Sequence, residues 1–143
     1  MARSRGARVG HHRLIGMRLL LDSHALMWAL GDDDLLHPEA HQAIKSGGNS
    51  VYVSVGSLWE LYLKTNIGKV TLVENFREEV ELSCFRILQI EFPHLETYRN
   101  LPVIPKHRDP FDRLLVAQAI SEGLTIVTRD EKLGQYGVPI LKA

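Results

Sequence analysis

The sequence has a single cysteine, Cys84, among its 143 residues. Without a second cysteine no intramolecular disulfide can form, and a zinc site built on cysteine thiolates lacks the ligands it needs. This cysteine content suits a reducing compartment, so we expect a cytoplasmic protein.

Long hydrophobic runs are lacking as well. The apolar run Leu19–Leu21 is ended at once by Asp22, and no run approaches the roughly 18 residues that a membrane-spanning helix needs. We therefore expect no membrane association. Hydrophobic residues make up 45% of the chain and charged residues 24%, which at this length is typical of one globular domain.

The chain also has no excess of charge of one sign, because 17 Lys and Arg balance 17 Asp and Glu. Residues 1–16 contain four arginines and no acid, which leaves the remainder with a net charge of −4. Such a body repels polyanions, so a nucleic-acid substrate would require a metal ion or a local basic patch. We interpret residues 1–16 as a basic leader, either a disordered segment, an overlong start before Met17 or an RNA-touching arm, and residues 17–143 as the domain.

Beyond the leader, short apolar runs alternate with helical patterns. We expect strands at Met17–Asp22, Val51–Val53, Arg86–Ile90, Leu124–Val127 and Val138–Leu141. Helices are expected at His24–Leu30, Pro38–Lys45, Ser54–Asn66, Glu74–Ser83, Phe92–Asn100 and Asp109–Glu122, and loops at Gly31–Asp34 and Pro102–Arg108. This alternation predicts an α/β fold with a mostly parallel sheet of four to five strands, covered by helices on both faces.

Four carboxylates are expected at one edge of that sheet. Asp22 and Asp130 each follow a strand, while Glu60 and Asp112 lie in early turns of helices near the same edge. Nearby like charges raise one another's pKa unless a cation neutralises them, and a set of carboxylate oxygens selects Mg²⁺ or Mn²⁺. Asp22 and Asp130 can each also cap a following helix, so the convergence of all four residues carries the prediction of a metal site.

Asp109, Asp112 and Glu60 also have structural explanations. Asp109 is the natural N-cap of the last long helix. Asp112 can support the dipole of that helix, yet its position faces inward, which favours a functional role. Glu60 lies three residues after Ser57, a capping-box spacing, and four residues before Lys64, a spacing that allows an ion pair.

Four segments of the sequence resemble PIN-domain toxins of the VapC type. They are Leu19–Trp28, Ser54–Lys64 with Gly68 and Lys69, His107–Gln118 with its Asp-Pro-Phe-Asp-Arg block, and Thr128–Asp130. The order and spacing of these segments agree with the family, and the resemblance extends from Met17 to Leu141.

The resemblance implies a PIN-like three-layer α/β/α sandwich and an endoribonuclease that uses Mg²⁺ or Mn²⁺ and leaves a 5′-phosphate. It assigns the metal to Asp22, Asp112 and Asp130, adds Glu60 to the catalytic set, and places Thr128 and Asp109 along the site. It also implies a cognate antitoxin as partner, RNA as substrate, and a homodimer or a toxin–antitoxin hetero-oligomer.

Basic and aromatic residues near these motifs are less specific. Lys64, Arg108 and Arg113 are candidates to contact the RNA backbone, although each can equally be a solvated surface charge or pair with a neighbouring acid. Trp28 and Trp59 can stack on an unpaired base, but their apolar neighbours favour a place in the core or at a partner contact.

Two other function classes remain as alternatives. The first is a catalytically silent PIN scaffold that binds RNA or protein. The second is a Mg²⁺-dependent phosphotransfer protein, which the sequence disfavours because His24 stands where a dehalogenase-type phosphatase has its second aspartate. A zinc site at His37 and His41 is also disfavoured, because Pro38 puts His37 at a helix boundary.

Overall fold

The computed structural model describes residues 16–143. The interpretation of residues 1–16 as a leader lies outside the described residues, except for Gly16. The strands are β2 (Arg18–Leu21), β3 (Ser50–Ser54), β4 (Arg86–Leu88), β5 (Thr125–Thr128) and β6 (Ile140–Lys142). The helices are α1 (Ser23–Gly31), η2 (Asp33–Leu35), α2 (Pro38–Lys45), α3 (Val55–Asn66), α4 (Phe76–Leu82), α5 (Phe92–Arg99), α6 (Pro110–Glu122) and η3 (Glu131–Tyr136).

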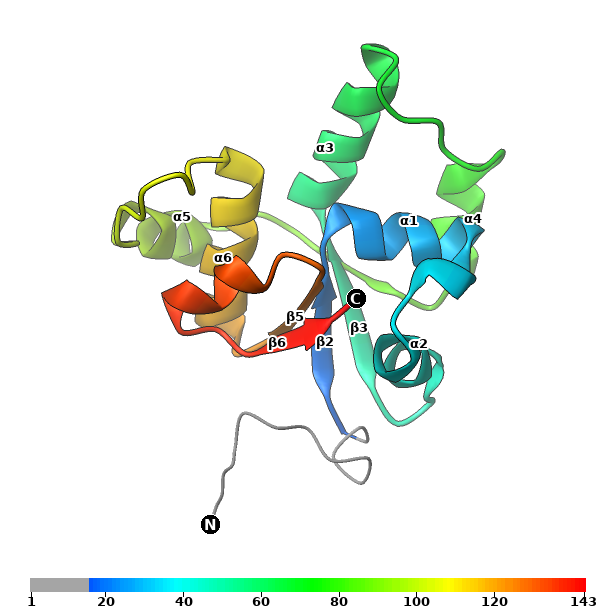
Figure 1. The fold of residues 1–143 in the computed structure, drawn as a ribbon, viewed down its shortest axis with the longest axis horizontal. Coiled ribbons are helices and arrows are strands. Elements are labelled where there is room, and N and C mark those ends of the chain that lie inside the picture. The colour runs from blue at the N-terminus through cyan, green and yellow to red at the C-terminus, as the bar shows by residue number, and fades with distance from the viewer. Residues whose placement is uncertain (1–15) are drawn as a thin grey trace.

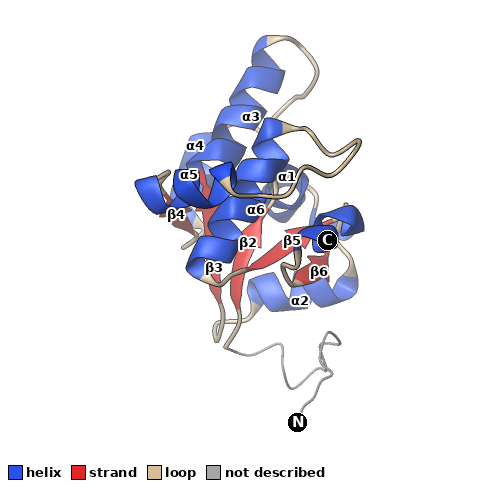
Figure 2. Cartoon of the chain, turned by 90° about the vertical axis from the view of Figure 1, so that its left-hand side faces the viewer, coloured by secondary structure: helices blue, strands red, loops and turns tan. Residues whose placement is uncertain are grey.

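The five strands form one parallel sheet in the order β4-β3-β2-β5-β6. Figure 1 shows α5 and α6 on one side of this sheet and α1, α2 and α4 on the other, and Figure 2 shows the same layers after a quarter turn. This arrangement confirms the predicted α/β/α sandwich with a parallel sheet.

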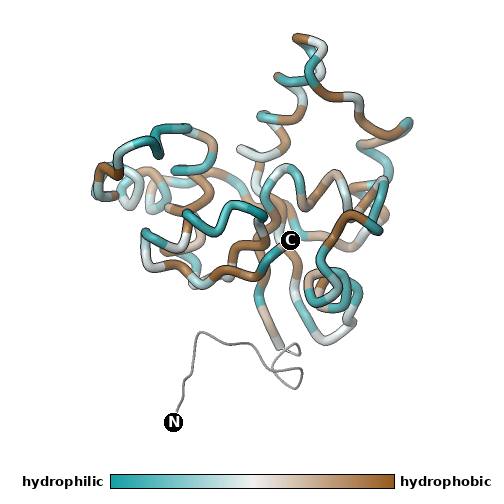
Figure 3. Tube along the Cα trace, in the orientation of Figure 1, coloured by the Kyte–Doolittle hydropathy of each residue, from teal (hydrophilic) through white to brown (hydrophobic). Residues whose placement is uncertain are grey.

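Strand β2 divides the hydrophobic core in two because its successive side chains point to opposite faces. Leu19 and Leu21 join the cluster formed with α1, α2 and α4, whereas Leu20 joins the cluster formed with α6 and β5. All three leucines are fully buried. Figure 3 shows the resulting pattern, with hydrophobic stretches on the central strands and hydrophilic residues on the outer loops.

Two short helical segments were not predicted. Segment η2 lies largely within residues expected as a loop, and η3 follows Asp130. Both are 3₁₀ helices of three to six residues, too short to produce an apolar periodicity in the sequence.

The predicted capping box at Ser57 and Glu60 is wrong. Helix α3 already begins at Val55, and its N-cap is Ser54, whose Oγ accepts a hydrogen bond from the Gly56 amide at 2.9 Å. Glu60 therefore lies in the second turn, beyond the reach of the helix start.

The chain reverses its direction of winding between β2 and β5. From β2 it passes to β3 and β4 on one side, and it later returns to β5 and β6 on the other side of β2. In open parallel sheets the crevice at such a point, at the carboxyl ends of the strands, is the usual place of a binding site.

Residues 16–143 include no helix that is long and apolar enough to span a membrane.

Arg113 connects the loop before α6 to Tyr136 of η3. Its Nη1 donates to the Pro102 carbonyl at 3.1 Å and to the Tyr136 hydroxyl at 2.9 Å. The guanidinium also lies over the rings of Tyr98, at 5.4 Å, and Tyr136, at 5.8 Å. The side chain thus holds the segment that leads into α6.

We expect Arg113→Gln to lower the free energy of unfolding by about 1–2 kcal/mol, because it removes two hydrogen bonds and two cation–π contacts. Urea denaturation of the purified protein measures this change. The matched control is Arg99→Gln, since Arg99 is exposed and, among residues 16–143, pairs only with Glu96 on its own helix, and we expect a loss below about 0.5 kcal/mol. Equal stability of the two variants would contradict the assigned role.

Candidate functional site

Asp22 lies at the carboxyl end of the central strand of the sheet. It directly follows β2, and its Oδ1 accepts a hydrogen bond from the Ala25 amide at 2.8 Å, which makes it the N-cap of α1. Burial raises the pKa of Asp22 above its ordinary value, although hydrogen bonds from the Thr128 hydroxyl and the Ala25 amide oppose this shift. The residue is therefore a cap and, at the same time, a carboxyl group held in an environment that disfavours its charge.

Asp130 follows the neighbouring strand β5. Its backbone amide donates to Thr128 Oγ1 at 3.0 Å, and its Oδ1 accepts from the Lys132 amide at 3.1 Å, so it caps η3. Thr128 is fully buried and bonds to both Asp22 and Asp130. Its hydroxyl therefore fixes the two strand ends relative to each other.

Helix α6 brings two further acids to this edge. Asp109 is its N-cap and accepts hydrogen bonds from the amides of Phe111 at 2.8 Å and Asp112 at 3.1 Å. The pKa of Asp112 is raised to about 7, first because the carboxyl is buried and then because Asp109, Glu60, Asp22 and Asp130 repel its charge.

Glu60 reaches the same place from α3. It is a buried acid, with 8% of its surface exposed, and its Oε2 lies 3.0 Å from Lys64 Nζ one turn further along the helix. The predicted pairing of these two residues is thus present. The pair brings a positive charge next to the acids of this region.

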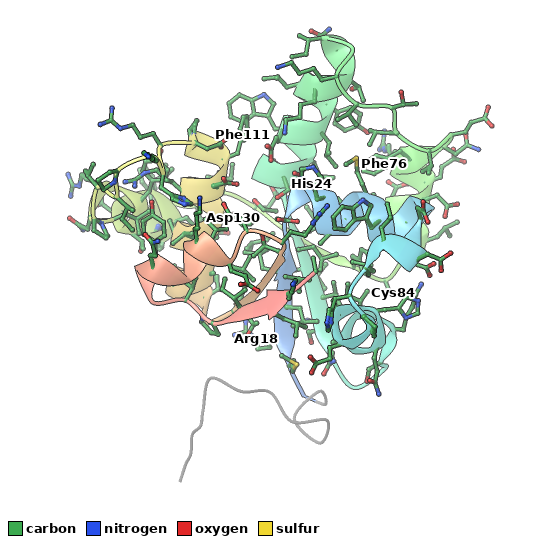
Figure 4. All side chains as sticks on the ribbon, in the orientation of Figure 1. Arg18, His24, Phe76, Cys84, Phe111 and Asp130 are labelled. Atoms are coloured by element: carbon green, nitrogen blue, oxygen red, sulfur yellow. The ribbon has the colours of Figure 1, made fainter. Side chains whose placement is uncertain are left out.

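These side chains surround one cavity of about 430 Å³. Figure 4 labels His24 and Asp130, which mark the start of α1 and the end of β5 at this edge of the sheet, between α3 and α6. The lining residues are Asp22, Ser23, His24, Glu60, Lys64, Asp109, Asp112, Thr128, Arg129 and Asp130. All four acids of the predicted catalytic set, as well as Asp109 and Thr128, are brought together.

The donor chemistry of the cavity suits a hard divalent cation. Five carboxylates line it, and their mutual repulsion contributes to the raised pKa of Asp112. Within residues 16–143, no three His, Cys, Asp or Glu side chains already stand close enough to hold a metal ion together. Coordination would thus require the carboxylates to turn further into the cavity, which side chains at a partly open site can do by changing rotamer.

The three predicted RNA-contacting residues occupy different positions. Lys64 lines the cavity, whereas Arg108 and Arg113 do not. Arg108 is exposed in the loop before α6, and Arg113 points to Pro102 and Tyr136. Three lining residues, Ser23, His24 and Arg129, were missed, although all three lie within the motif segments Leu19–Trp28 and Thr128–Asp130.

The two tryptophans also differ. Trp28 is in the core with 8% exposure, one of its two predicted places, whereas Trp59 is 58% exposed and lies outside the core, so that a partner contact stays the prediction for it. Trp59 packs edge-on against Phe111 of α6, with ring centroids 4.9 Å apart. Its neighbour Leu58 is partly buried and packs against the core.

The sheet order and the acidic cavity define an α/β domain of the PIN type. The family profile described as "PIN domain" matches residues 19–139, and the chain therefore belongs to the PIN-domain family. No protein in the curated comparison matches the sequence.

Several solved structures share the fold at low sequence identity. The structure of VapBC2 from Rickettsia felis with a promoter DNA fragment has 17% identity and a TM-score of 0.65, covering 87% of this chain and 98% of that one. DNA-bound VapBC from Salmonella typhimurium has 18% identity and a TM-score of 0.62, covering 87% and 97%. FitAcB from Neisseria gonorrhoeae has 20% identity and a TM-score of 0.57, covering 87% and 96%.

The raised pKa of Asp112 predicts how the stability of the metal-free protein depends on pH. Because the pKa of about 7 in the folded protein exceeds the ordinary 3.8, the folded state binds the proton more tightly. The free energy of unfolding should therefore fall as the pH rises from about 4 to about 8. Asp112→Asn should remove part of this fall and be more stable than the wild type at pH 8 in chelator, by roughly 1–2 kcal/mol since the carboxyl is partly exposed.

Urea denaturation at a series of pH values in chelator measures this effect. Asp34→Asn is the matched control, because Asp34 is exposed and does not line the cavity. Parallel pH profiles for wild type and Asp112→Asn would contradict the prediction.

Proposed function

We propose that this chain is a metal-dependent endoribonuclease of the VapC type, the toxin of a toxin–antitoxin pair, which hydrolyses RNA phosphodiester bonds with Mg²⁺ or Mn²⁺. The observation that carries the proposal is the convergence of Asp22, Glu60, Asp109, Asp112 and Asp130 on one cavity. Membership of the PIN-domain family supports it. Several structures of the same fold are complexes of toxin–antitoxin systems.

In this proposal Asp22, Asp112 and Asp130 hold the metal ion. When bound, the ion supplies a Lewis acid for the scissile phosphate and lowers the pKa of a water molecule. Thr128 keeps Asp22 and Asp130 in place through its hydroxyl. We assign to Glu60 the removal of a proton from the attacking water, a role supported by its position in the cavity lining and by its ion pair with Lys64.

We assign different roles to the three basic residues that were predicted to contact RNA. Lys64 is the predicted RNA contact that lines the cavity, and we propose that it binds a phosphate next to the acids. Arg108 is exposed and remains a candidate for a flanking phosphate contact. Arg113 is engaged with Pro102 and Tyr136, so we assign it to the loop rather than to RNA.

The test is cleavage of a structured RNA pool by the purified protein with Mg²⁺, Mn²⁺ or chelator. We expect cutting with either metal and none with chelator. A preparation of Asp22→Asn, purified in the same way, separates cutting by this protein from cutting by a contaminant. Cleavage of equal extent under all conditions and by both proteins would contradict the proposal.

The alternative is a catalytically silent PIN scaffold that binds RNA or protein. The observation in its favour is that, in the described chain, no three potential ligands already stand within reach of one ion. The silent scaffold predicts RNA binding without cleavage at any metal concentration. The phosphotransfer alternative lacks a comparable observation.

The proposed protein partner is an antitoxin that covers a groove near the acids. Residues of α1 line both the acidic cavity and an apolar groove, and Trp28 of the groove contacts Arg129 of the cavity. The groove is lined by Met27, Trp28, Leu72, Val73 and Phe76, with Gly31, Asp32 and Thr71. A homodimer is compatible with the exposed Trp59 and Ile67 on and after α3. Loss of inhibition on deletion of the antitoxin's C-terminal segment would support this docking, and unchanged inhibition would contradict it.

A further inference from the structure

Arg129 is the cavity-lining cation that the proposed mechanism does not use. Two side chains with a permanent positive charge line the cavity, Lys64 and Arg129. Lys64 Nζ lies 3.0 Å from Glu60. Within residues 16–143 the Arg129 guanidinium has no carboxylate within 4.0 Å, although five of them surround the same cavity.

An aromatic side chain holds Arg129 in its place. The guanidinium carbon lies 5.0 Å from the centroid of the Trp28 ring, and Trp28 itself is buried in the core. The His24 ring lies beside the same tryptophan, with centroids 5.7 Å apart. The buried Trp28 ring thus offers the Arg129 guanidinium a cation–π contact at the rim of the cavity.

The local backbone explains why Arg129 points outward. Thr128 and Asp130 on either side of it are bonded to each other, through the Thr128 hydroxyl and the Asp130 amide. The carbonyl of Arg129 accepts from the Glu131 amide at 3.1 Å at the start of η3. This turn places the threonine hydroxyl at the buried end of the cavity and leaves the arginine side chain exposed at its rim.

A cavity with five carboxylates repels a phosphodiester unless positive charge stands next to it. A guanidinium binds phosphate oxygens through two parallel N–H groups, and its planar face stacks on an unpaired base. We propose that Arg129 binds the RNA phosphate adjacent to the one that is cut, with Trp28 as its support. This inference rests on the proposed function and adds a substrate-positioning residue to it.

A purely structural role of the Arg129–Trp28 pair predicts a different experimental result. If the Arg129–Trp28 pair only stabilised α1 against β5, its loss would change stability and leave RNA affinity unaltered. RNA affinity and its dependence on salt concentration are therefore the decisive measurements, because each phosphate contact to a single strand contributes about 0.7 to the slope of log K against log salt.

The experiment is fluorescence anisotropy with a labelled single-stranded RNA of random sequence, in Mg²⁺ and at several salt concentrations. All proteins carry Asp112→Asn so that the RNA is not cut. We expect Arg129→Gln to bind roughly tenfold more weakly than the parent at low salt and to lower the salt slope by about 0.7. Arg129→Lys should retain the slope, because it keeps the charge, and bind with intermediate affinity.

The matched control is Arg77→Gln, since Arg77 is an exposed arginine of α4 that does not line the cavity, and its affinity should equal that of the parent. Binding of the parent together with equal binding by Arg129→Gln would overturn this inference alone. Failure of the parent and of the wild type to bind RNA at any salt concentration would overturn the proposed function together with it.

Discussion

Replacing Asp112 with asparagine should lower the rate of RNA cleavage by roughly 10³-fold or more. The change removes one carboxylate oxygen donor and its charge from the cavity while it preserves the shape of the side chain. Single-turnover cleavage of an RNA that the wild type cuts, at saturating Mn²⁺, measures the loss. In chelator near neutral pH the variant is expected to be at least as stable as the wild type, so an unfolded preparation does not account for the loss.

Two variants show whether the effect is specific. Asp34→Asn, outside the cavity, should cut at the wild-type rate. Asp109→Asn should lose less than about tenfold, because asparagine is as good an N-cap as aspartate and Asp109 is already engaged by the amides of Phe111 and Asp112. A decrease of similar size for Asp109→Asn and Asp112→Asn would mean that general negative charge, rather than ligation by Asp112, supports cleavage.

The largest expected effect on stability is at His94, which is fully buried between α5 and α6. Its Nδ1 accepts from the Glu91 amide at 3.1 Å, so Nε2 carries the proton and donates to Glu122 at 2.7 Å. The amide of Gln118 also lies beside Nδ1, at 3.3 Å, and Gln118 accepts a hydrogen bond from Ser54 at the start of α3. The histidine thus belongs to a network that joins three helices.

His94→Leu should lower the free energy of unfolding by about 3 kcal/mol, because it leaves several buried polar groups without partners. Urea denaturation measures the loss, and Leu95→Ala on the exposed side of the same helix is the control. A loss below about 1 kcal/mol would show that water replaces the imidazole. Since Ser54 precedes the helix that carries Glu60, we also expect the variant to cut RNA more slowly than the control.

The sequence by itself was sufficient to predict the fold class and to predict that the acids meet at one edge of the sheet. Strand residues such as Leu19–Leu21 are apolar throughout because a parallel sheet is buried on both faces. Asp22 and Asp130 follow parallel strands, and Asp112 follows a recognisable N-cap, so their common edge can be inferred from chain order alone. These features depend on local chemistry and on the parallel direction of the strands.

Only the tertiary structure decided what the basic and aromatic residues do. Arg113 and Arg129 each adjoin a site acid in the sequence, yet Arg113 extends to Tyr136 and Arg129 to the cavity beside Trp28. Trp28 is buried because α1 packs flat against the sheet, whereas Trp59 is exposed because α3 projects beyond it (Figure 1). The direction of a long side chain depends on partners distant in sequence, and neither residue type nor spacing contains that information.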